Sequence, residues 1–187
     1  MRLNTFDILL CSGTPLVSRI IRRTNRIMGY TKAESKISHV AMIYRENESL
    51  PFVFESTSMN KWAGKNGVQL NPFNEWITNY PGRVWVRNLF HNKPPIPIEN
   101  IAKYINSRLG LPYENGIGGL LELISVYLPL INFKTPEPHC TEEDAKCLQH
   151  FDLMLNVMPN KLPPAFWWGD RLRRIMNCRV GEPVKLK

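Results

Sequence analysis

Two short apolar runs separated by a turn constrain this chain most, because together they predict an antiparallel β-hairpin. Residues 37–45 read I-S-H-V-A-M-I-Y-R and residues 52–57 read F-V-F-E-S-T, and both have the length and composition of strands. Residues 46–51 between them are typical of a turn. Because side chains alternate between the two faces of a strand, His39 and Glu55 can share one face of this hairpin. The pattern therefore allows an imidazole and a carboxylate to meet across adjacent strands.

A helix is predicted to start near Cys140. The segment 136–150 reads P-E-P-H-C-T-E-E-D-A-K-C-L-Q-H, in which prolines end the preceding segment and hydroxyl and carboxylate residues suit a first turn. The unpaired N–H groups and positive dipole end of such a helix favour the thiolate, which is the reactive form of cysteine. The three acidic side chains after Cys140 oppose this effect. We expect them to point outward to water, where their charge is screened.

Cys140, His39 and Glu55 are the candidate catalytic residues if folding brings them together. A carboxylate on one ring nitrogen would orient the imidazole, and the other nitrogen could take the proton of the thiol. Each residue also has an ordinary structural interpretation. A histidine in an apolar strand is often a partnered core residue, a glutamate near a strand end often lies at the surface, and a buried cysteine is often inert.

The size and composition predict a single domain over residues 1–187, because 187 residues with 43% hydrophobic content suffice for one core. The N-terminal apolar run is too short for a secretory signal. Residues 117–131 are the most apolar stretch, but Glu122 and Pro129 interrupt it below the roughly 20 residues that a spanning helix needs. These features indicate a cytoplasmic protein without a transmembrane helix.

Residues 16–27 predict a basic amphipathic helix. Apolar residues alternate in it with four arginines, Arg19, Arg22, Arg23 and Arg26, which supply much of the net charge of +8. One interpretation is a solvated arginine face over an apolar stripe that packs on the core. The other is peripheral association with an anionic surface, either a membrane or a cell-wall polymer. No zinc-finger spacing or aromatic RNA-binding signature is present, which argues against a specific nucleic-acid module.

The four cysteines do not predict disulfides or a metal site. They are too few and too scattered for an extracellular disulfide framework in a chain without a signal. His139, Cys140, Cys147 and His150 look like zinc ligands at first. If one helix carries both thiols, however, seven residues of rise separate them by roughly 10 Å, too far to share one metal. No metal or organic cofactor is needed by the chemistry considered above.

Further elements follow in the order strand, helix, strand, helix. Residues 67–70 and 83–89 predict strands, residues 73–80 a short helix between them, and residues 98–109 a longer helix. A strand at residues 6–11 opens the chain.

The order of these segments resembles that of the circularly permuted papain-like cysteine hydrolases of the NlpC-type superfamily, in the YiiX-like branch. Seven short strings carry the resemblance in family order: D-I-L-L, S-H-V-A-M-I-Y, V-F-E-S-T, G-V-Q-L-N-P-F-N-E-W, G-R-V-W-V-R-N-L, L-G-L-P-Y and C-T-E-E. The resemblance implies an α+β papain-like fold, with a central antiparallel β-sheet or half-barrel packed against helices and the nucleophile at a helix N-terminus.

The resemblance also implies roles for particular residues. Cys140 would be the nucleophile, His39 the general base and acid, and Glu55 the residue that orients His39. Tyr113 would lie near the oxyanion site, with the backbone N–H of Cys140 as the main donor. A hydrophobic and proline-rich insertion at about residues 116–138, between Tyr113 and Cys140, leaves the substrate open.

Three functions fit these residues. The first is hydrolysis of an amide bond, in a cell-wall peptide or a related peptide, through a thioester acyl-enzyme. The second is a lipid acyl hydrolase or acyltransferase at a membrane surface. The third is a non-catalytic basic binding module on the same fold. The sequence does not distinguish oligomeric states.

Overall fold

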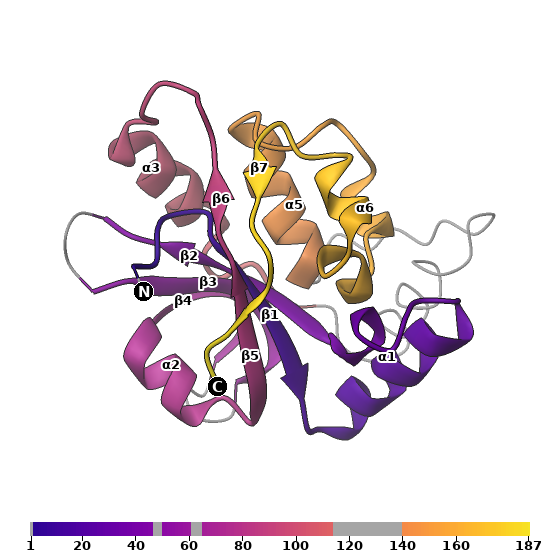
Figure 1. Cartoon of the computed structure of the whole chain (residues 1–187). Helices are drawn as coiled ribbons and strands as arrows, with labels where there is room; N and C mark the ends of the chain where they lie inside the picture. The colour runs from indigo at the N-terminus through magenta and orange to yellow at the C-terminus, as the bar shows by residue number, and fades with distance from the viewer. Residues whose placement is uncertain (1, 47–49, 61–64, 114–139) are drawn as a thin grey trace.

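A six-stranded antiparallel sheet forms the centre of the computed structural model, which describes residues 2–46, 50–60, 65–113 and 140–187 (Figure 1). The strand order is β4-β3-β2-β1-β5-β8. The strands are β1 (Ile8–Gly13), β2 (His39–Tyr44), β3 (Phe52–Asn60), β4 (Lys65–Pro72), β5 (Gly82–Arg87) and β8 (Val184–Lys185). A second, two-stranded sheet pairs β6 (Leu89–Phe90) with β7 (Arg179–Val180). This mixed architecture confirms the predicted α+β class.

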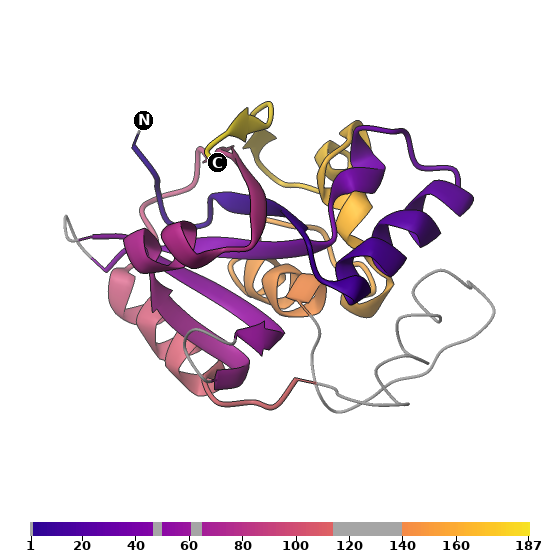
Figure 2. The same ribbon diagram turned by 90° about the horizontal axis from the view of Figure 1, so that it is seen from below.

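Helices lie on both faces of the central sheet (Figures 1 and 2). The α-helices are α1 (Leu16–Ile27), α2 (Phe73–Asn79), α3 (Ile98–Arg108), α5 (Cys140–His150) and α6 (Asp170–Arg173), and short 3₁₀ helices are η1 (Glu34–Lys36), η2 (Pro159–Lys161) and η3 (Pro164–Trp167). Helices α3, α5 and α6 pack on one face, whereas α2 packs on the other.

The alternation of side chains along β1 and β2 divides the interior into two apolar clusters. Ile8 and Leu10 face the cluster that contains α3 and α5, whereas Leu9 and Cys11 face the cluster that contains Trp76 of α2. All four β1 side chains are fully buried. Because both faces of this strand are covered, its sequence is a continuous apolar run rather than an alternating one.

Strands β2 and β3 form the predicted hairpin. They are antiparallel neighbours, with Ile43 opposite Val53. On the other side of β2, His39 lies opposite Cys11 of β1. His39 is thus the first residue of a central strand, at the end of the sheet where β1 finishes.

The L-G-L-P-Y segment docks on the edge strand β4. The N–H of Val68 donates to the carbonyl of Leu111 at 2.8 Å, and the N–H of Gly110 donates to the carbonyl of Val68 at 2.9 Å. Gly67 adopts φ +106°, and a Cβ there would lie 2.1 Å from the Leu111 carbonyl oxygen. Only glycine allows this close approach, which brings Tyr113 beside the sheet.

Helix α1 forms as predicted, but its apolar stripe faces away from the core rather than toward it. Its buried residue is the polar Asn25, whose amide donates to the carbonyl of Ile37 at 2.9 Å. Leu16 and Ile27 are 71% and 75% exposed. The interpretation of an apolar stripe facing the core is therefore wrong, because side-chain hydrogen bonds rather than apolar contacts attach this helix.

A buried arginine joins the sheet to the C-terminal segments. Arg87 is 1% exposed and donates to the carbonyls of Trp167, Trp168, Gly169 and Gly181 at 2.7 to 3.1 Å. Burial lowers the pKa of this guanidinium to about 10, and the positive charge of Arg173 acts in the same direction. The group nevertheless stays charged at neutral pH.

We expect Arg87→Met to destabilise the fold by about 3–5 kcal/mol, because it leaves four carbonyls without their donor. Urea unfolding followed by circular dichroism measures the change. Arg83→Met is the matched control, since Arg83 is exposed on the same strand and should change stability by about 0.5 kcal/mol or less. Equal effects of the two substitutions would contradict this account of Arg87.

The predicted insertion at about residues 116–138 lies outside the described residues. The single domain over residues 1–187 stays a prediction. Among the described residues, no helix is long and apolar enough to cross a membrane.

Candidate active site

Cys140 is the first residue of α5, as the sequence predicts, and it is 7% exposed. The first N–H groups of a helix have no partner within it, and Cys140 lies at this end of α5. Helix α5 packs against β2 and β3. This packing brings Cys140 to the strand that begins with His39.

His39 is paired with Glu55 across the β2–β3 hairpin. The distance from Nε2 of His39 to Oε2 of Glu55 is 2.8 Å, and the two side chains are 14% and 3% exposed. Cys140 is the other side chain that acts on His39, since its negative charge and hydrogen bonding are among the causes that raise the pKa of His39. Because Nε2 is occupied by the carboxylate, Nδ1 is the ring nitrogen that remains for the sulfur. The structure thus pairs His39 with Glu55 and places Cys140 near enough to act on the charge of His39.

Three donors from β4 and α2 hold the other oxygen of Glu55. Oε1 accepts from Trp76 Nε1 at 2.9 Å, from Asn71 Nδ2 at 3.1 Å and from Gln69 Nε2 at 3.4 Å. Sequence reasoning missed these residues. The available signal was two amides, Gln69 and Asn71, two residues apart and therefore on the same face of a strand. Their hydrogen bonds orient the carboxylate so that Oε2 faces His39.

The charges around His39 favour its protonated form. Burial alone would lower the pKa of His39, but the negative charge of Cys140 and its hydrogen bond, followed by those of Glu55, raise this pKa from 6.5 to about 10. The coupling is reciprocal, because a thiolate that stabilises an imidazolium is stabilised by it to the same extent. The arrangement suits a thiolate–imidazolium pair.

The acidic side chains after Cys140 do not point outward to water, and that expectation is wrong. Glu143 and Asp144 are 0% and 1% exposed. Glu143 is neutralised by Arg108, whose guanidinium donates to both carboxylate oxygens at 2.7 and 2.8 Å. Glu142 pairs with Lys146 at 2.7 Å. These ion pairs, rather than solvent screening, limit the negative charge near the sulfur.

Asp144 avoids adding negative charge in a different way. Both of its carboxyl oxygens are buried and have no hydrogen-bond partner among the described residues. Burial, followed by the negative charge of Cys140, raises the pKa of Asp144 well above its ordinary 3.8, although nearby His39 opposes the shift. The carboxyl therefore keeps its proton to a higher pH than a surface aspartate does.

The ring of Tyr80 lies beside the ring of His39. The Tyr80 ring is near-parallel to the His39 ring, with centroids 6.5 Å apart, and also stacks on Trp76 at 4.8 Å. Burial raises the pKa of Cys11, and hydrogen bonding from the neighbouring Tyr80 partly opposes this rise. These contacts restrict the orientation of the imidazole.

The three other cysteines are in environments that suppress reactivity. Burial raises the pKa of Cys11 and of Cys147 well above the usual 9.0, and raises the pKa of Cys178 to about 11. Cys147 packs within the larger apolar cluster. None of these three thiols has the local chemistry of Cys140.

Tyr113 is half-buried at the end of a described segment. Its place near an oxyanion site stays a prediction.

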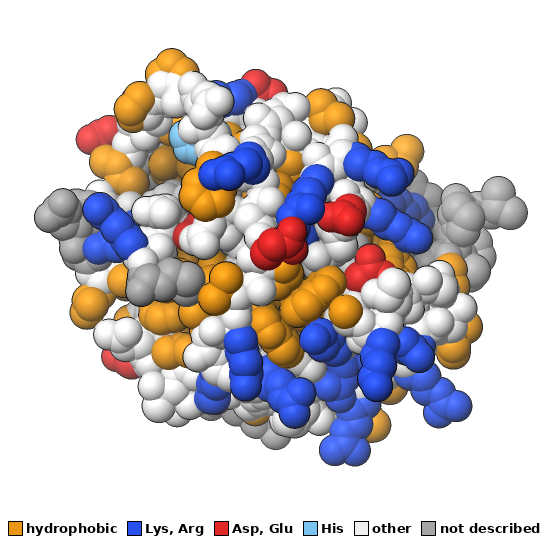
Figure 3. Space-filling model, in the orientation of Figure 1, with side chains coloured by type: hydrophobic (Ala, Val, Ile, Leu, Met, Phe, Trp, Pro, Cys, Tyr) orange, Lys and Arg blue, Asp and Glu red, His pale blue; other side chains and the backbone are white. Residues whose placement is uncertain are grey.

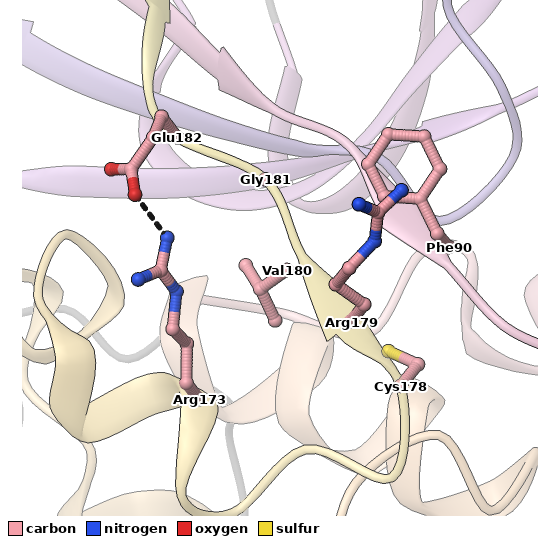
Figure 4. Close-up of a pocket in the computed structure, with 7 residues that line it drawn as sticks. All are labelled: Phe90, Arg173, Cys178, Arg179, Val180, Gly181 and Glu182. Atoms are coloured by element: carbon pink, nitrogen blue, oxygen red, sulfur yellow. Dashed lines mark hydrogen bonds and ion pairs between the residues drawn. The ribbon is translucent and has the colours of Figure 1, made fainter.

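A cavity of about 550 Å³ lies elsewhere in the molecule, between β6, β7 and the C-terminal segment (Figure 4). Its arginines already have partners: Arg173 pairs with Glu182, and Arg179 stacks on Phe90 at 4.4 Å. The cavity shares no residue with the Cys140, His39 and Glu55 group. In the described part of the chain, no three or more His, Cys, Asp or Glu residues are arranged to hold a metal ion.

The chain has a YiiX-like fold. It is similar over its whole length to a solved structure described as the metalloprotein YiiX from Escherichia coli O157:H7, with a TM-score of 0.55, and the match covers 98% of that chain. The sequence identity is 17%, so the likeness concerns the fold alone. No protein-family model matches the chain. No curated protein sequence matches it either. The fold is consistent with the predicted papain-like architecture, which is compatible with a hydrolase.

Proposed function

We propose that this protein is a cysteine hydrolase that cleaves an amide bond through a thioester acyl-enzyme. The observation that carries this proposal is the position of His39, whose Nε2 lies 2.8 Å from Oε2 of Glu55 and whose pKa the neighbouring Cys140 raises against the effect of burial. A partnered core histidine would need one such contact. A histidine between a carboxylate and a thiol at a helix N-terminus has the geometry of a base that activates a nucleophile.

The reaction begins with the Cys140 thiol giving its proton to His39. The sulfur attacks the carbonyl carbon of the substrate, a C–S bond forms, and the imidazolium returns the proton to the leaving nitrogen as the C–N bond breaks. Water, deprotonated by His39, then hydrolyses the thioester and regenerates the thiol. The positioned base contributes roughly 10²–10⁴ in rate.

The backbone N–H of Cys140 is the proposed main donor to the oxyanion. The first N–H groups of α5 point out of the helix N-terminus, where the dipole also favours negative charge. Tyr113 is the proposed second group at this site. A preorganised oxyanion site adds roughly 10² or more in rate.

Alkylation by iodoacetamide tests the nucleophile without knowledge of the substrate. At about pH 6 we expect Cys140 to react roughly 100-fold faster than Cys11, Cys147 or Cys178, because an ordinary thiol is almost fully protonated there. The rate at Cys140 should stay level until His39 loses its proton near its pKa of about 10, since the imidazolium maintains the thiolate up to that point. Peptide mapping by mass spectrometry reads out each cysteine separately.

The same experiment separates an enzyme from a non-catalytic binding module. His39→Gln should slow the labelling of Cys140 at pH 6 and leave the other three thiols unchanged. If Cys140 labels no faster than Cys178 in the wild type, the protein is not a cysteine hydrolase. Binding of an anionic partner by Cys140→Ser would then support the module.

Hydrolysis of lipid acyl groups is the second candidate, and the exposed apolar and basic side chains of α1 favour it. Both reactions use the same thioester chemistry. The protein is incubated with cell-wall peptides in one sample and with phospholipid vesicles in another. Only the sample that contains a substrate should leave an acyl adduct on Cys140. The mass of that adduct decides between the two, and a fatty-acyl mass would overturn the amide assignment.

A further inference from the structure

Helix α1 exposes an apolar surface that a helix packed on its own domain would bury. Four large apolar side chains of α1 and that of Met28, the residue after it, are exposed: Leu16 (71%), Val17 (48%), Ile20 (47%), Ile27 (75%) and Met28 (43%). These are five of the eleven large hydrophobic side chains exposed in the described part of the chain. Single exposed apolar residues are ordinary, but such a concentration on one helix indicates an interaction surface.

The exposed residues form a stripe. At about 100° per residue, Leu16, Ile20 and Ile27 fall within roughly 40° of one another around the helix axis. The side of α1 that meets the protein is polar and is tied down by hydrogen bonds. Asn25 bonds the Ile37 carbonyl, and Arg22 donates to the Ser12 hydroxyl, both at 2.9 Å. The stripe therefore points away from the domain.

Arginines border the apolar stripe on one side. Arg19, Arg23 and Arg26 are all exposed, and within the described residues none of them forms an ion pair with a carboxylate. The helix itself contains no acidic residue. Lys and Arg side chains gather over α1 at the lower right of the molecule, with hydrophobic atoms among them (Figure 3).

We propose that α1 docks the protein on an anionic lipid surface, with its apolar stripe in the acyl boundary and its arginines on the headgroups. An amphipathic helix of this kind lies in the plane of the interface. A nucleic acid would use the arginines but not an aliphatic stripe. A second copy would bring the arginines of both protomers together, and like charges oppose that pairing. A lipid surface uses both features.

The docked helix lies next to the candidate active site. Arg22 bonds Ser12, the residue after Cys11, and Cys11 is paired with His39 in the sheet. Docking through α1 thus places the catalytic end of the sheet near the lipid surface. Docking requires no catalysis, so the Cys140→Ser variant should bind vesicles like the wild type. Vesicle binding by this variant therefore tests the docking independently of the proposed function.

Cosedimentation of the full chain with vesicles tests the docking. We expect binding to vesicles of phosphatidylcholine with phosphatidylglycerol to be at least about tenfold tighter than to phosphatidylcholine alone. Arg23→Gln and Arg26→Gln should each weaken binding about fivefold. Lys103→Gln, on the exposed face of α3, is the charge control and should have little effect.

The apolar stripe is tested by Leu16→Ser combined with Ile27→Ser. This pair should weaken vesicle binding roughly tenfold, since two large apolar side chains lose their contact with the acyl region. Leu155→Ser with Met158→Ser is the matched control, because these residues are 46% and 66% exposed outside α1. Urea unfolding checks that both pairs keep the stability of the wild type.

Three results would overturn the proposal. Wild-type affinity of the Leu16→Ser, Ile27→Ser pair for the anionic vesicles would show that the stripe does not enter lipid. If vesicle binding depends on the arginines alone, and the protein binds duplex DNA as tightly as it binds the vesicles, the helix would be assigned to a nucleic acid. Sedimentation velocity without vesicles gives the third test. A wild-type dimer that the Leu16→Ser, Ile27→Ser pair converts to a monomer would assign the stripe to a second copy of this chain.

Discussion

Cys140→Ser should lower hydrolysis of the substrate that acylates the wild type by about 10⁴-fold or more. A serine hydroxyl holds its proton far more tightly than a thiol, so His39 cannot maintain it as an anion. The proposed thiolate–imidazolium pair is then lost, and with it the negative charge of Cys140 that helps to raise the pKa of His39. Product release measured by mass spectrometry gives the rate.

Cys178→Ser is the matched control for this substitution. Cys178 is half-buried, and burial raises its thiol pKa to about 11, so it carries little thiolate at neutral pH. We expect its replacement to leave the rate unchanged. A Cys140→Ser enzyme with more than a tenth of the wild-type activity would exclude Cys140 as the nucleophile.

Glu55→Gln should lower kcat/KM by roughly 10²–10⁴, by changing the tautomer of His39. Trp76, Asn71 and Gln69 all donate to Oε1, so the amide oxygen of a glutamine would take that position and its NH₂ group would face His39. Nε2 would then have to accept a hydrogen bond, which places the ring proton on Nδ1, facing the sulfur. A protonated Nδ1 in a neutral ring cannot take the thiol proton.

Two further measurements make this prediction specific. The ¹⁵N chemical shifts of His39 should report the Nδ1–H tautomer in Glu55→Gln, and Cys140 should lose its rapid alkylation at pH 6. Glu75→Gln, an exposed carboxylate in the first turn of α2, is the control and should change neither property. An unchanged tautomer with full activity would show that Glu55 only supports the fold.

Local sequence patterns predicted the elements that carry the site. The apolar runs around His39 and Glu55 predicted the hairpin, because strand length and alternation depend on neighbouring residues. The prolines and acidic residues around Cys140 predicted a helix start for the same reason. Gln69, Asn71 and Trp76 were missed as partners of Glu55, since their contact depends on the register between strands and on the position of α2.

Two predictions about orientation were wrong, and both concern charged helices. Glu143 and Asp144 were expected to face water, but Arg108 from α3 allows Glu143 to be buried as an ion pair. In one of the two interpretations of α1 its apolar stripe faces the core, but hydrogen bonds of Asn25 and Arg22 turn it outward. Helical periodicity shows that a helix has two faces, yet it does not show which face meets the protein.

The order of strands and helices, and the residue types able to activate a thiol, were determined by the sequence alone. Only the tertiary structure decided that His39 pairs with Glu55 close to Cys140, that Glu55 is oriented by three donors, and that α1 exposes its apolar side. The physical reason is the range of the interactions. Strand and helix propensities act between neighbours in the chain, whereas the contacts of the site join residues separated by up to 101 positions, from His39 to Cys140.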